Sequence, residues 1–122
     1  MKTAIFVYGT LKRGQRNHHF LNNQKFLGDA QTEPRYRLYD AGRHPALVDD
    51  PQNGIAVQGE VWQVSEETLQ KLDEYEGMPD YFSRKSIHLQ GWDTSVQAYF
   101  FNGDVTNLKD CGDCWPPGVS LS

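Results

Sequence analysis

Residues 55–77 read IAVQGEVWQVSEETLQKLDEYEG, and two periodicities meet in this stretch. Over Ile55–Val64 apolar side chains occur on both alternating faces, which predicts a strand that is partly covered on each side. Ser65 then precedes two acidic residues, a pattern that predicts a helix capped by Ser65 and running to about Glu76. Gly77 suits the C′ position just beyond such a helix. The stretch therefore predicts a strand followed by a helix.

Short apolar, β-prone runs separated by glycine, proline and asparagine make up much of the remaining chain. One short helix is expected from Asn17, as its N-cap, through Leu21, and a turn is expected at 50–54. Strands and helices do not alternate regularly, which indicates an α+β domain with a mixed or antiparallel sheet that can curl into a barrel. The predicted strands are Ala4–Tyr8, Phe26-Leu27, Tyr36–Tyr39, Tyr81–Leu89 and Ser95–Asn102.

The length of 122 residues predicts a single domain spanning residues 1–122. Hydrophobic residues make up 38% of the chain, and 6 Phe, 6 Tyr and 3 Trp supply bulk for a core. This composition excludes disorder as the main state. The tail Cys111–Ser122 carries two prolines and is expected to be irregular.

The charge balance argues against several classes of partner. With 12 basic and 16 acidic residues the formal net charge is −4, so neither nucleic acid nor an anionic membrane is an expected partner. No apolar run approaches the ~20 residues of a membrane helix, and the N-terminus lacks the features of a signal peptide. With only two cysteines, too close together for a disulfide framework, a cytoplasmic location is expected.

The first candidate site is Tyr8-Gly9-Thr10-Leu11, where a predicted strand ends and a loop begins. Gly14 completes a Gly-x-x-x-x-Gly spacing, but Gln15 and Arg16 follow where a nucleotide P-loop needs Lys and then Ser or Thr. A P-loop is therefore rejected. A glycine at a strand end still lets the backbone approach a ligand, and free N–H groups there can bind a carboxylate or an oxyanion. The alternative interpretation is an ordinary turn.

The second candidate is Glu76, at the end of the predicted helix. It follows Leu69 by seven residues and Leu72 by four, so it lies on the stripe that these leucines bury. Burial and the negative end of the helix dipole both raise the pKa of a carboxyl group. A carboxyl group with a raised pKa can act as general base and then general acid near neutrality. The alternative is a frayed helix end with Glu76 in water.

Cysteine and histidine positions indicate no further site. Cys111 and Cys114 form a CxxC, but Trp115-Pro116-Pro117 follows and breaks the helix that a redox CxxC requires. No second CxxC completes a zinc site. His18 and His19 diverge by ~100° on a helix and cannot chelate one ion together. No metal ligands are therefore expected.

Several blocks of the sequence together resemble one family, and they cover nearly the whole chain in the family's order. The blocks are Phe6–Gln15 with Asn17-His18, Tyr36–Tyr39 with Gly42 and Pro45-Ala46, Val57–Trp62, Leu72–Gly77, and Gly112-Asp113 with Trp115. The chain is similar to the γ-glutamylcyclotransferase-like proteins, with its closest similarity to the γ-glutamylamine cyclotransferase and the small bacterial AIG2-like and YtfP-like branch.

The resemblance implies a mixed β-barrel flanked by a few short helices, with a cavity at the barrel mouth. It implies that the Tyr8-Gly9-Thr10-Leu11 loop binds substrate through its backbone and that Glu76 is the catalytic base and acid. Family members often place a Tyr two residues before an Arg in the next strand. Here Phe82 holds that place before Arg84, with Tyr81 beside it. Tyr81 and Phe82 are therefore the further candidate substrate-binding residues.

The reaction implied by the resemblance is an intramolecular acyl transfer on a small-molecule substrate. A γ-glutamyl amine or γ-glutamyl amino compound cyclises to 5-oxoproline and releases the amine, without a metal or organic cofactor. Arg37, Arg43 and Arg84 are candidates for contacts with substrate carboxylates. The alternatives are a non-catalytic small-molecule-binding member of the family and a relative that trims γ-glutamyl groups in a biosynthetic pathway. The leaving group and the oligomeric state stay open at this point.

Overall fold

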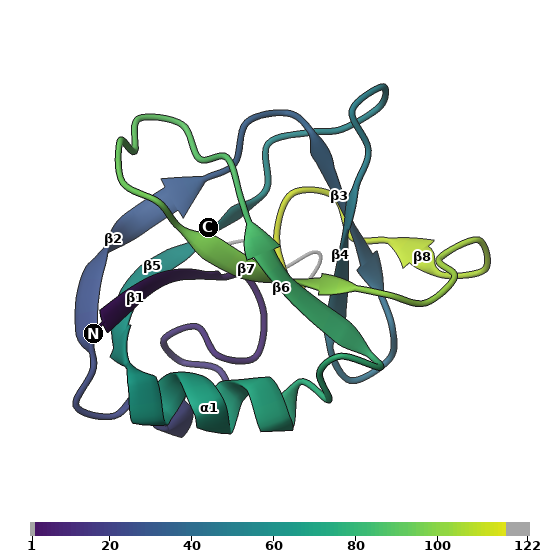
Figure 1. The fold of residues 1–122 in the computed structure, drawn as a ribbon. Coiled ribbons are helices and arrows are strands. Elements are labelled where there is room, and N and C mark those ends of the chain that lie inside the picture. The colour runs from purple at the N-terminus through teal and green to yellow at the C-terminus, as the bar shows by residue number, and fades with distance from the viewer. Residues whose placement is uncertain (1, 117–122) are drawn as a thin grey trace.

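The computed structural model describes residues 2–116, so Met1 and residues 117–122 of the predicted domain and tail lie outside the described residues. Figure 1 shows two sheets and one α-helix beside them. The larger sheet has the strand order β2-β5-β1-β7-β6. Its strands are β1 (Lys2–Val7), β2 (Lys25–Gln31), β5 (Gln58–Ser65), β6 (Phe82–Ser86) and β7 (Gln97–Phe101).

The smaller sheet has the order β4-β3-β8, with β3 (Tyr36–Asp40), β4 (Pro45–Asp49) and β8 (Lys109–Asp110). In the larger sheet β1 pairs antiparallel with β5 and parallel with β7, which confirms the mixed α+β architecture. One isolated β-bridge joins Thr32, which follows the edge strand β2, to Leu89, which follows the edge strand β6. Over residues 2–116 the ladders do not close into a barrel, so the predicted barrel is not confirmed.

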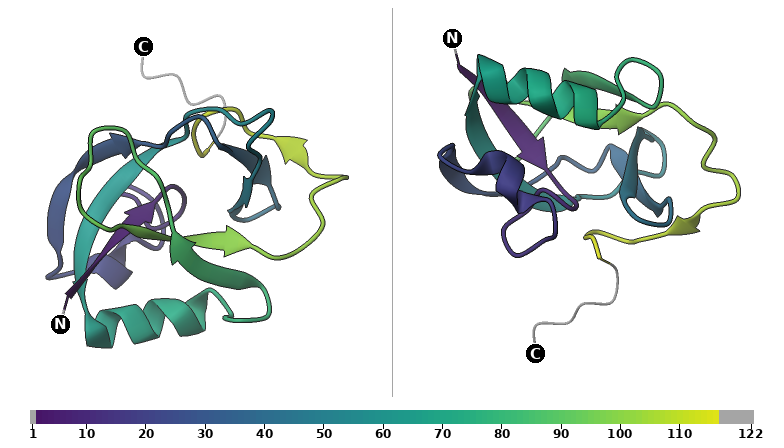
Figure 2. Two further views of the ribbon diagram at one scale, coloured as in Figure 1. Left: turned by 45° about the horizontal axis from the view of Figure 1, so that its top comes forward. Right: turned by 90° about the horizontal axis from the view of Figure 1, so that it is seen from below.

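The helix α1 (Glu66–Tyr75) follows β5 directly, as the sequence pattern predicts. Ser65 caps it, since the Ser65 hydroxyl accepts a hydrogen bond of 3.2 Å from the Thr68 N–H. Leu72 is fully buried, which contributes roughly 2 kcal/mol to holding the helix on the sheet. Gly77 takes a left-handed φ of 66° just beyond the helix and confirms the predicted C′ position. The views in Figure 2 show α1 at the end of β5 from which it emerges, beside β1.

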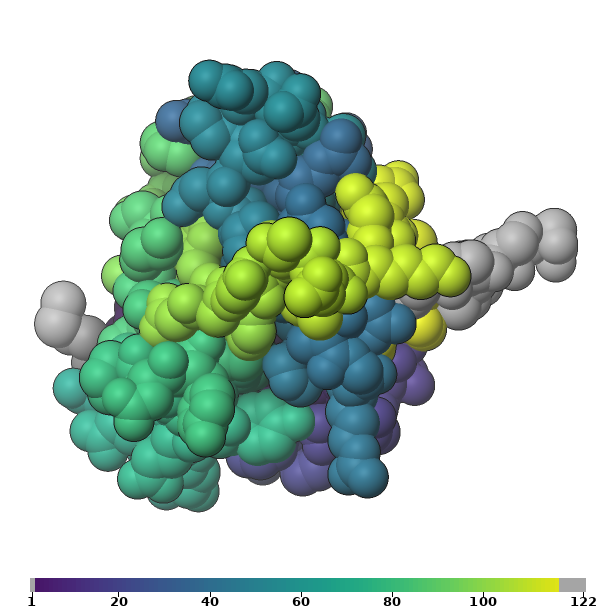
Figure 3. Space-filling view, turned by 90° about the vertical axis from the view of Figure 1, so that its right-hand side faces the viewer, coloured from purple at the N-terminus to yellow at the C-terminus, as the bar shows by residue number. Residues whose placement is uncertain are grey.

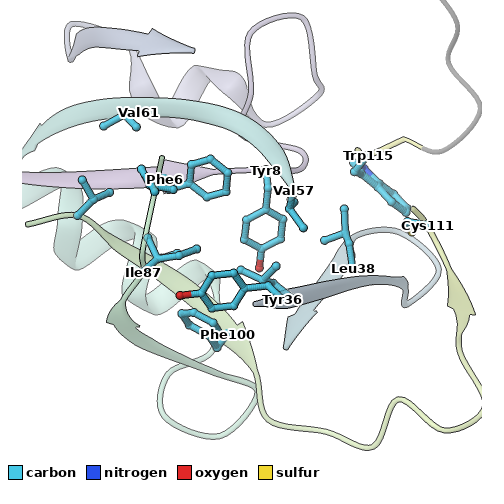
Figure 4. Close-up of a cluster of buried hydrophobic side chains, with 14 residues drawn as sticks. Phe6, Tyr8, Tyr36, Leu38, Val57, Val61, Ile87, Phe100, Cys111 and Trp115 are labelled. Carbon is cyan, nitrogen blue, oxygen red and sulfur yellow. The ribbon is translucent and has the colours of Figure 1, made fainter. Parts of the chain in front are cut away.

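Strands β1 and β5 separate two hydrophobic cores. Phe6 and Val61 face the first core, which includes the aromatic side chains in Figure 4. Ile5, Trp62 and Val64 face the second core, which α1 covers. The prediction that the strand around residue 60 is covered on both faces is therefore confirmed.

Several local predictions differ from the structure. The 3-10 helix η1 (His18–Leu21) is present, but the side chain of Asn17 does not cap it. The strand predicted at Tyr81–Leu89 ends at Ser86, and β4 was not predicted at all. Strand β4 begins at a proline and its apolar run is too short to alternate, so only pairing with β3 defines it. The connection between β7 and β8 crosses the face formed by the β3–β4 hairpin (Figure 3).

Candidate active site

A pocket of about 440 Å³ opens where the end of β1, the end of α1, β7 and the segment before β4 come together. Seven of the candidate residues from the sequence line it: Tyr8, Gly9, Thr10, Leu11, Glu76, Tyr81 and Phe82. Residues as far apart in the chain as Phe6 and Phe101 thus meet at one site. The lining residues that sequence reasoning missed include His44, Pro45, Tyr99 and Phe101.

The loop after β1 approaches the wall of the pocket closely. A Cβ atom on Gly9 would lie 2.4 Å from Cγ of Pro45, so any side chain at Gly9 would push these segments apart. The Gly9 carbonyl accepts from the Lys12 N–H at 3.1 Å. Within residues 2–116, the amide N–H groups of Gly9, Thr10 and Leu11 donate to no other group. They are therefore available for an anionic group of a ligand.

Glu76 occupies the C-cap of α1, and its backbone N–H donates to the Leu72 carbonyl at 2.9 Å. Burial raises the pKa of the Glu76 carboxyl group to about 7. No described side chain or backbone group donates a hydrogen bond to this carboxyl group. A half-buried carboxyl group without a donor is suited to gaining and losing a proton near neutral pH.

Two tyrosines form the wall of the pocket around Glu76. The Tyr8 hydroxyl donates to the carbonyl of Tyr99, and burial followed by the charge of Glu76 raises the pKa of Tyr8 well above its usual value. The Tyr99 hydroxyl donates to Oδ1 of Asp73 at 2.6 Å, and burial, with Asp73, raises the pKa of Tyr99 strongly. Both phenols therefore stay protonated at neutral pH.

The three candidate arginines lie elsewhere. Arg84 Nε is 3.2 Å from Oδ1 of Asp73, and Arg37 Nη1 is 3.1 Å from Oδ2 of Asp110. The carbonyl of Arg43 accepts from the guanidinium group of Arg16. None of the three candidates lines the pocket.

The two aromatic candidates occupy different parts of the pocket. Phe82 is only 6% exposed and packs edge-on against His44 and Phe101, with ring centroids 5.5 and 5.6 Å away. Tyr81 is 69% exposed at the pocket mouth. Phe82 thus forms part of an apolar wall, whereas Tyr81 is a largely exposed side chain at the edge of the pocket.

Cysteine and histidine side chains take other roles. Cys111 and Cys114 are free thiols, and burial, followed by the charges of Asp40 and Asp110, raises the pKa of Cys111 to about 11. This is opposite to the lowered pKa of a reactive cysteine. Among the residues that the structure describes, no three His, Cys, Asp or Glu side chains gather as metal ligands. The described helices are also too short and polar to span a membrane.

Comparison with known proteins identifies the family. The family model described as "Gamma-glutamyl cyclotransferase, AIG2-like" matches residues 5–116. The chain belongs to this family. Like the resemblance seen in the sequence blocks, the match covers the strands, α1 and the pocket together.

Relatives within the AIG2-like family come from bacteria and animals. A Vibrio cholerae protein, named provisionally as a gamma-glutamylcyclotransferase, is 38% identical over 113 residues, which cover 93% of this chain and 96% of that protein. Bovine gamma-glutamylaminecyclotransferase is 44% identical over 92 residues, covering 70% of this chain and 55% of the bovine protein. The crystal structure of a mouse AIG2-like protein superposes with a TM-score of 0.76 at 32% identity, covering 83% of this chain and 78% of the mouse chain. Since these relatives include named cyclotransferases, the chain is of an enzyme family.

Proposed function

We propose that this protein converts a γ-glutamyl amine or a γ-glutamyl amino compound to 5-oxoproline and the free amine. The observation that carries the proposal is Glu76, a carboxyl group with a pKa of about 7 in a pocket that it shares with the Tyr8-Gly9-Thr10-Leu11 loop. The names of the mammalian relatives, gamma-glutamylaminecyclotransferases, support a γ-glutamyl amine as substrate.

In the proposed reaction the substrate is its own nucleophile. The Glu76 carboxylate takes a proton from the α-ammonium group, and the resulting amine attacks the γ-carbonyl carbon. A C–N bond forms and the carbonyl oxygen becomes an oxyanion. When the oxyanion collapses, the bond to the leaving nitrogen breaks and protonated Glu76 gives its proton to that nitrogen. The Glu76 carboxylate then takes the second proton from the ring nitrogen and passes it to the freed amine, which leaves the neutral lactam of 5-oxoproline and an ammonium group. A pKa of about 7 keeps both forms of Glu76 populated at neutral pH, as a base that becomes an acid requires.

The loop supplies the electrostatic part of the proposed mechanism. The N–H groups of Gly9, Thr10 and Leu11, which have no acceptor within residues 2–116, hold the α-carboxylate or the developing oxyanion of the substrate in this proposal. One such donor typically contributes about 3 kcal/mol in a water-poor site. Five-membered ring closure is largely a matter of holding the amine near the carbonyl carbon, which a pocket with fixed walls achieves.

The aromatic wall completes the proposed site. Phe82, Tyr99 and Phe101 present apolar surface to the pocket and limit its hydration, which keeps the pKa of Glu76 high. Tyr81 lies at the mouth and contacts the leaving group in this proposal. The site uses no residue of the CxxC.

The test is release of 5-oxoproline by the wild type, Glu76→Gln and the matched control Glu66→Gln. The panel contains γ-glutamyl amines, ε-(γ-glutamyl)lysine and γ-glutamyl amino acids. We expect Glu76→Gln to lower kcat by roughly a thousandfold, the scale of general acid–base catalysis, because Gln keeps the shape but exchanges no proton. Glu66 is exposed in the first turn of α1, away from the pocket, so Glu66→Gln should match the wild type.

The outcomes separate the proposal from its alternative. Wild-type turnover by Glu76→Gln would show that Glu76 is not the acid/base group. If the wild type released no 5-oxoproline from any compound of the panel, the non-catalytic binding member of the family would be the better interpretation.

A further inference from the structure

Asn17 contacts both the loop and the end of α1 that form the proposed site, although it does not line the pocket itself. Its side-chain Nδ2 donates to the Thr10 hydroxyl at 3.1 Å and to the Tyr75 hydroxyl. Thr10 belongs to the loop, and Tyr75 is the last residue of α1, directly before Glu76. One amide group therefore joins the loop to the end of the helix that carries the acid/base candidate.

The backbone of Asn17 also fixes the direction of the loop's peptide groups. In a trans peptide the C=O of one residue and the N–H of the next point in opposite directions. The Gly9 carbonyl accepts from the Lys12 N–H, and the Thr10 carbonyl accepts from the Asn17 N–H at 3.0 Å. The N–H groups of Thr10 and Leu11 must then point away from these bonds. Both residues line the pocket, and within residues 2–116 neither N–H has a partner.

The neighbouring His18 strengthens the same anchor. Its Nδ1 lies 2.9 Å from the Leu11 carbonyl, which assigns the ring proton to Nδ1, and its ring packs edge-on against Trp62. Asn17 and His18, at the start of η1, thus bind two successive carbonyl groups of the loop, those of Thr10 and Leu11.

We propose that Asn17 is a positioning residue that holds the N–H groups of the loop and the Glu76 end of α1 at a fixed separation, so that both engage one γ-glutamyl group. The inference rests on the proposed function and adds the residue that couples its two parts. Asn17 exchanges no proton and touches no reacting atom. Its loss should therefore lower turnover through geometry.

Three variants and one control test the coupling. Asn17→Ala removes the bonds to Thr10 and Tyr75, whereas Tyr75→Phe removes only the second and keeps the ring that packs on Phe20. We expect kcat/KM to fall by about tenfold to a hundredfold in Asn17→Ala and by less in Tyr75→Phe. The double variant should be no worse than Asn17→Ala, because the shared bond is already lost. Asn22→Ala, an exposed position at the other end of η1, should match the wild type.

The pH dependence distinguishes positioning from a general loss of stability. A looser helix end admits water to Glu76, so the acid limb of kcat should move to lower pH in Asn17→Ala and Tyr75→Phe but not in Asn22→Ala. None of these substitutions removes a titratable group facing Glu76 except the Tyr75 phenol. The groups that face it from the surrounding elements are Tyr8, His44, Glu74, Tyr81, Tyr99 and the Asp73–Arg84 pair.

Titration of the Glu76 carboxyl carbon by 13C NMR gives the same readout without turnover. It therefore separates a failure of the coupling from a failure of the proposed reaction. A lowered Glu76 pKa in both variants, with a non-additive loss in kcat/KM, supports the proposal. An unshifted Glu76 pKa, additive losses or wild-type kcat in both variants would overturn it. Tyr75→Phe keeps the test decisive if Asn17→Ala fails to fold.

Discussion

Two glutamates lie largely out of bulk water in this protein and behave in opposite ways. Glu60, on β5, is 7% exposed and accepts hydrogen bonds from the Trp62 indole, the Arg13 backbone and the Arg13 guanidinium group, each between 3.0 and 3.1 Å. Burial alone would raise the pKa of Glu60, but these donors lower it below its usual value. Glu76, at the end of α1, receives no such donor from residues 2–116, and burial raises its pKa to about 7.

The difference shows that donors, rather than depth, decide what a buried carboxyl group does. Glu60 is a fixed anion that ties Arg13, two residues beyond the Tyr8-Gly9-Thr10-Leu11 loop, to β5. Among the described residues, Glu76 forms hydrogen bonds only through its backbone, which leaves its carboxyl group available for a proton. The protein thus contains a structural carboxylate outside the pocket, on β5, and a carboxyl group in the pocket that is suited to acid–base chemistry.

The largest stability effect is expected at Glu76. In the unfolded chain this carboxyl group has a pKa near 4.5, whereas in the folded protein it is about 7. Between these values the unfolded chain loses the proton first, so ionisation of Glu76 destabilises the fold as pH rises. Glu76→Gln should therefore be more stable than the wild type at pH 8, by up to about 3 kcal/mol, with no such gain at pH 4. Urea unfolding at both values measures this, and equal stability of the two proteins at pH 8 would contradict the raised pKa.

The second largest effect on stability is expected at Glu60 and is opposite in sign to that at Glu76. Glu60→Gln should destabilise the protein at neutral pH by about 2 kcal/mol, because Arg13 and Trp62 lose an ionised acceptor. The pKa of Glu60 is lower in the folded protein than in the unfolded chain. The wild type's higher free energy of unfolding is therefore fully present above the pKa of the unfolded chain, and it is lost as pH falls through the pKa of the folded protein. Urea midpoints of both proteins along a pH series check this. An advantage of the wild type that grows toward acid pH would refute the role of Glu60 as a fixed anion.

The smallest effect on stability is expected at Asp29, the second carboxylate that contacts Arg13. Asp29 also contacts Arg13, at 2.9 Å, but its side chain is 77% exposed. Asp29→Asn should therefore change the free energy of unfolding by less than about 0.5 kcal/mol in the same urea experiment. A loss as large as that of Glu60→Gln would assign the anchoring of Arg13 to the exposed carboxylate instead.

The parts of the fold that follow from local periodicity could be predicted from the sequence. The two covered faces of β5, the Ser65 cap, Gly77 and the placement of Glu76 on the buried side of α1 all depend on residues within about two helical turns or one strand. The resemblance of the sequence blocks correctly indicated the family.

Features that depend on distant pairing could not be predicted in this way. Strand β4 exists through its pairing with β3, and Tyr99, which lines the pocket, lies on β7 and accepts a hydrogen bond at its carbonyl from Tyr8, 91 residues away. Asn17 looked like a helix cap because of its local sequence, yet its side chain binds Thr10 and Tyr75 instead. Its partners come from elements whose relative placement only the folded sheet defines.

The central claim is best tested by titrating the carboxyl carbons of Glu60 and Glu76 together by 13C NMR in the wild-type protein, with Glu76→Gln to assign the signal. We predict a Glu76 pKa of about 7 and a Glu60 pKa below 4.5 in the same sample. A Glu76 pKa near 4.5 would contradict the account, because the carboxyl group would then be a solvated helix end rather than the acid/base group of the pocket.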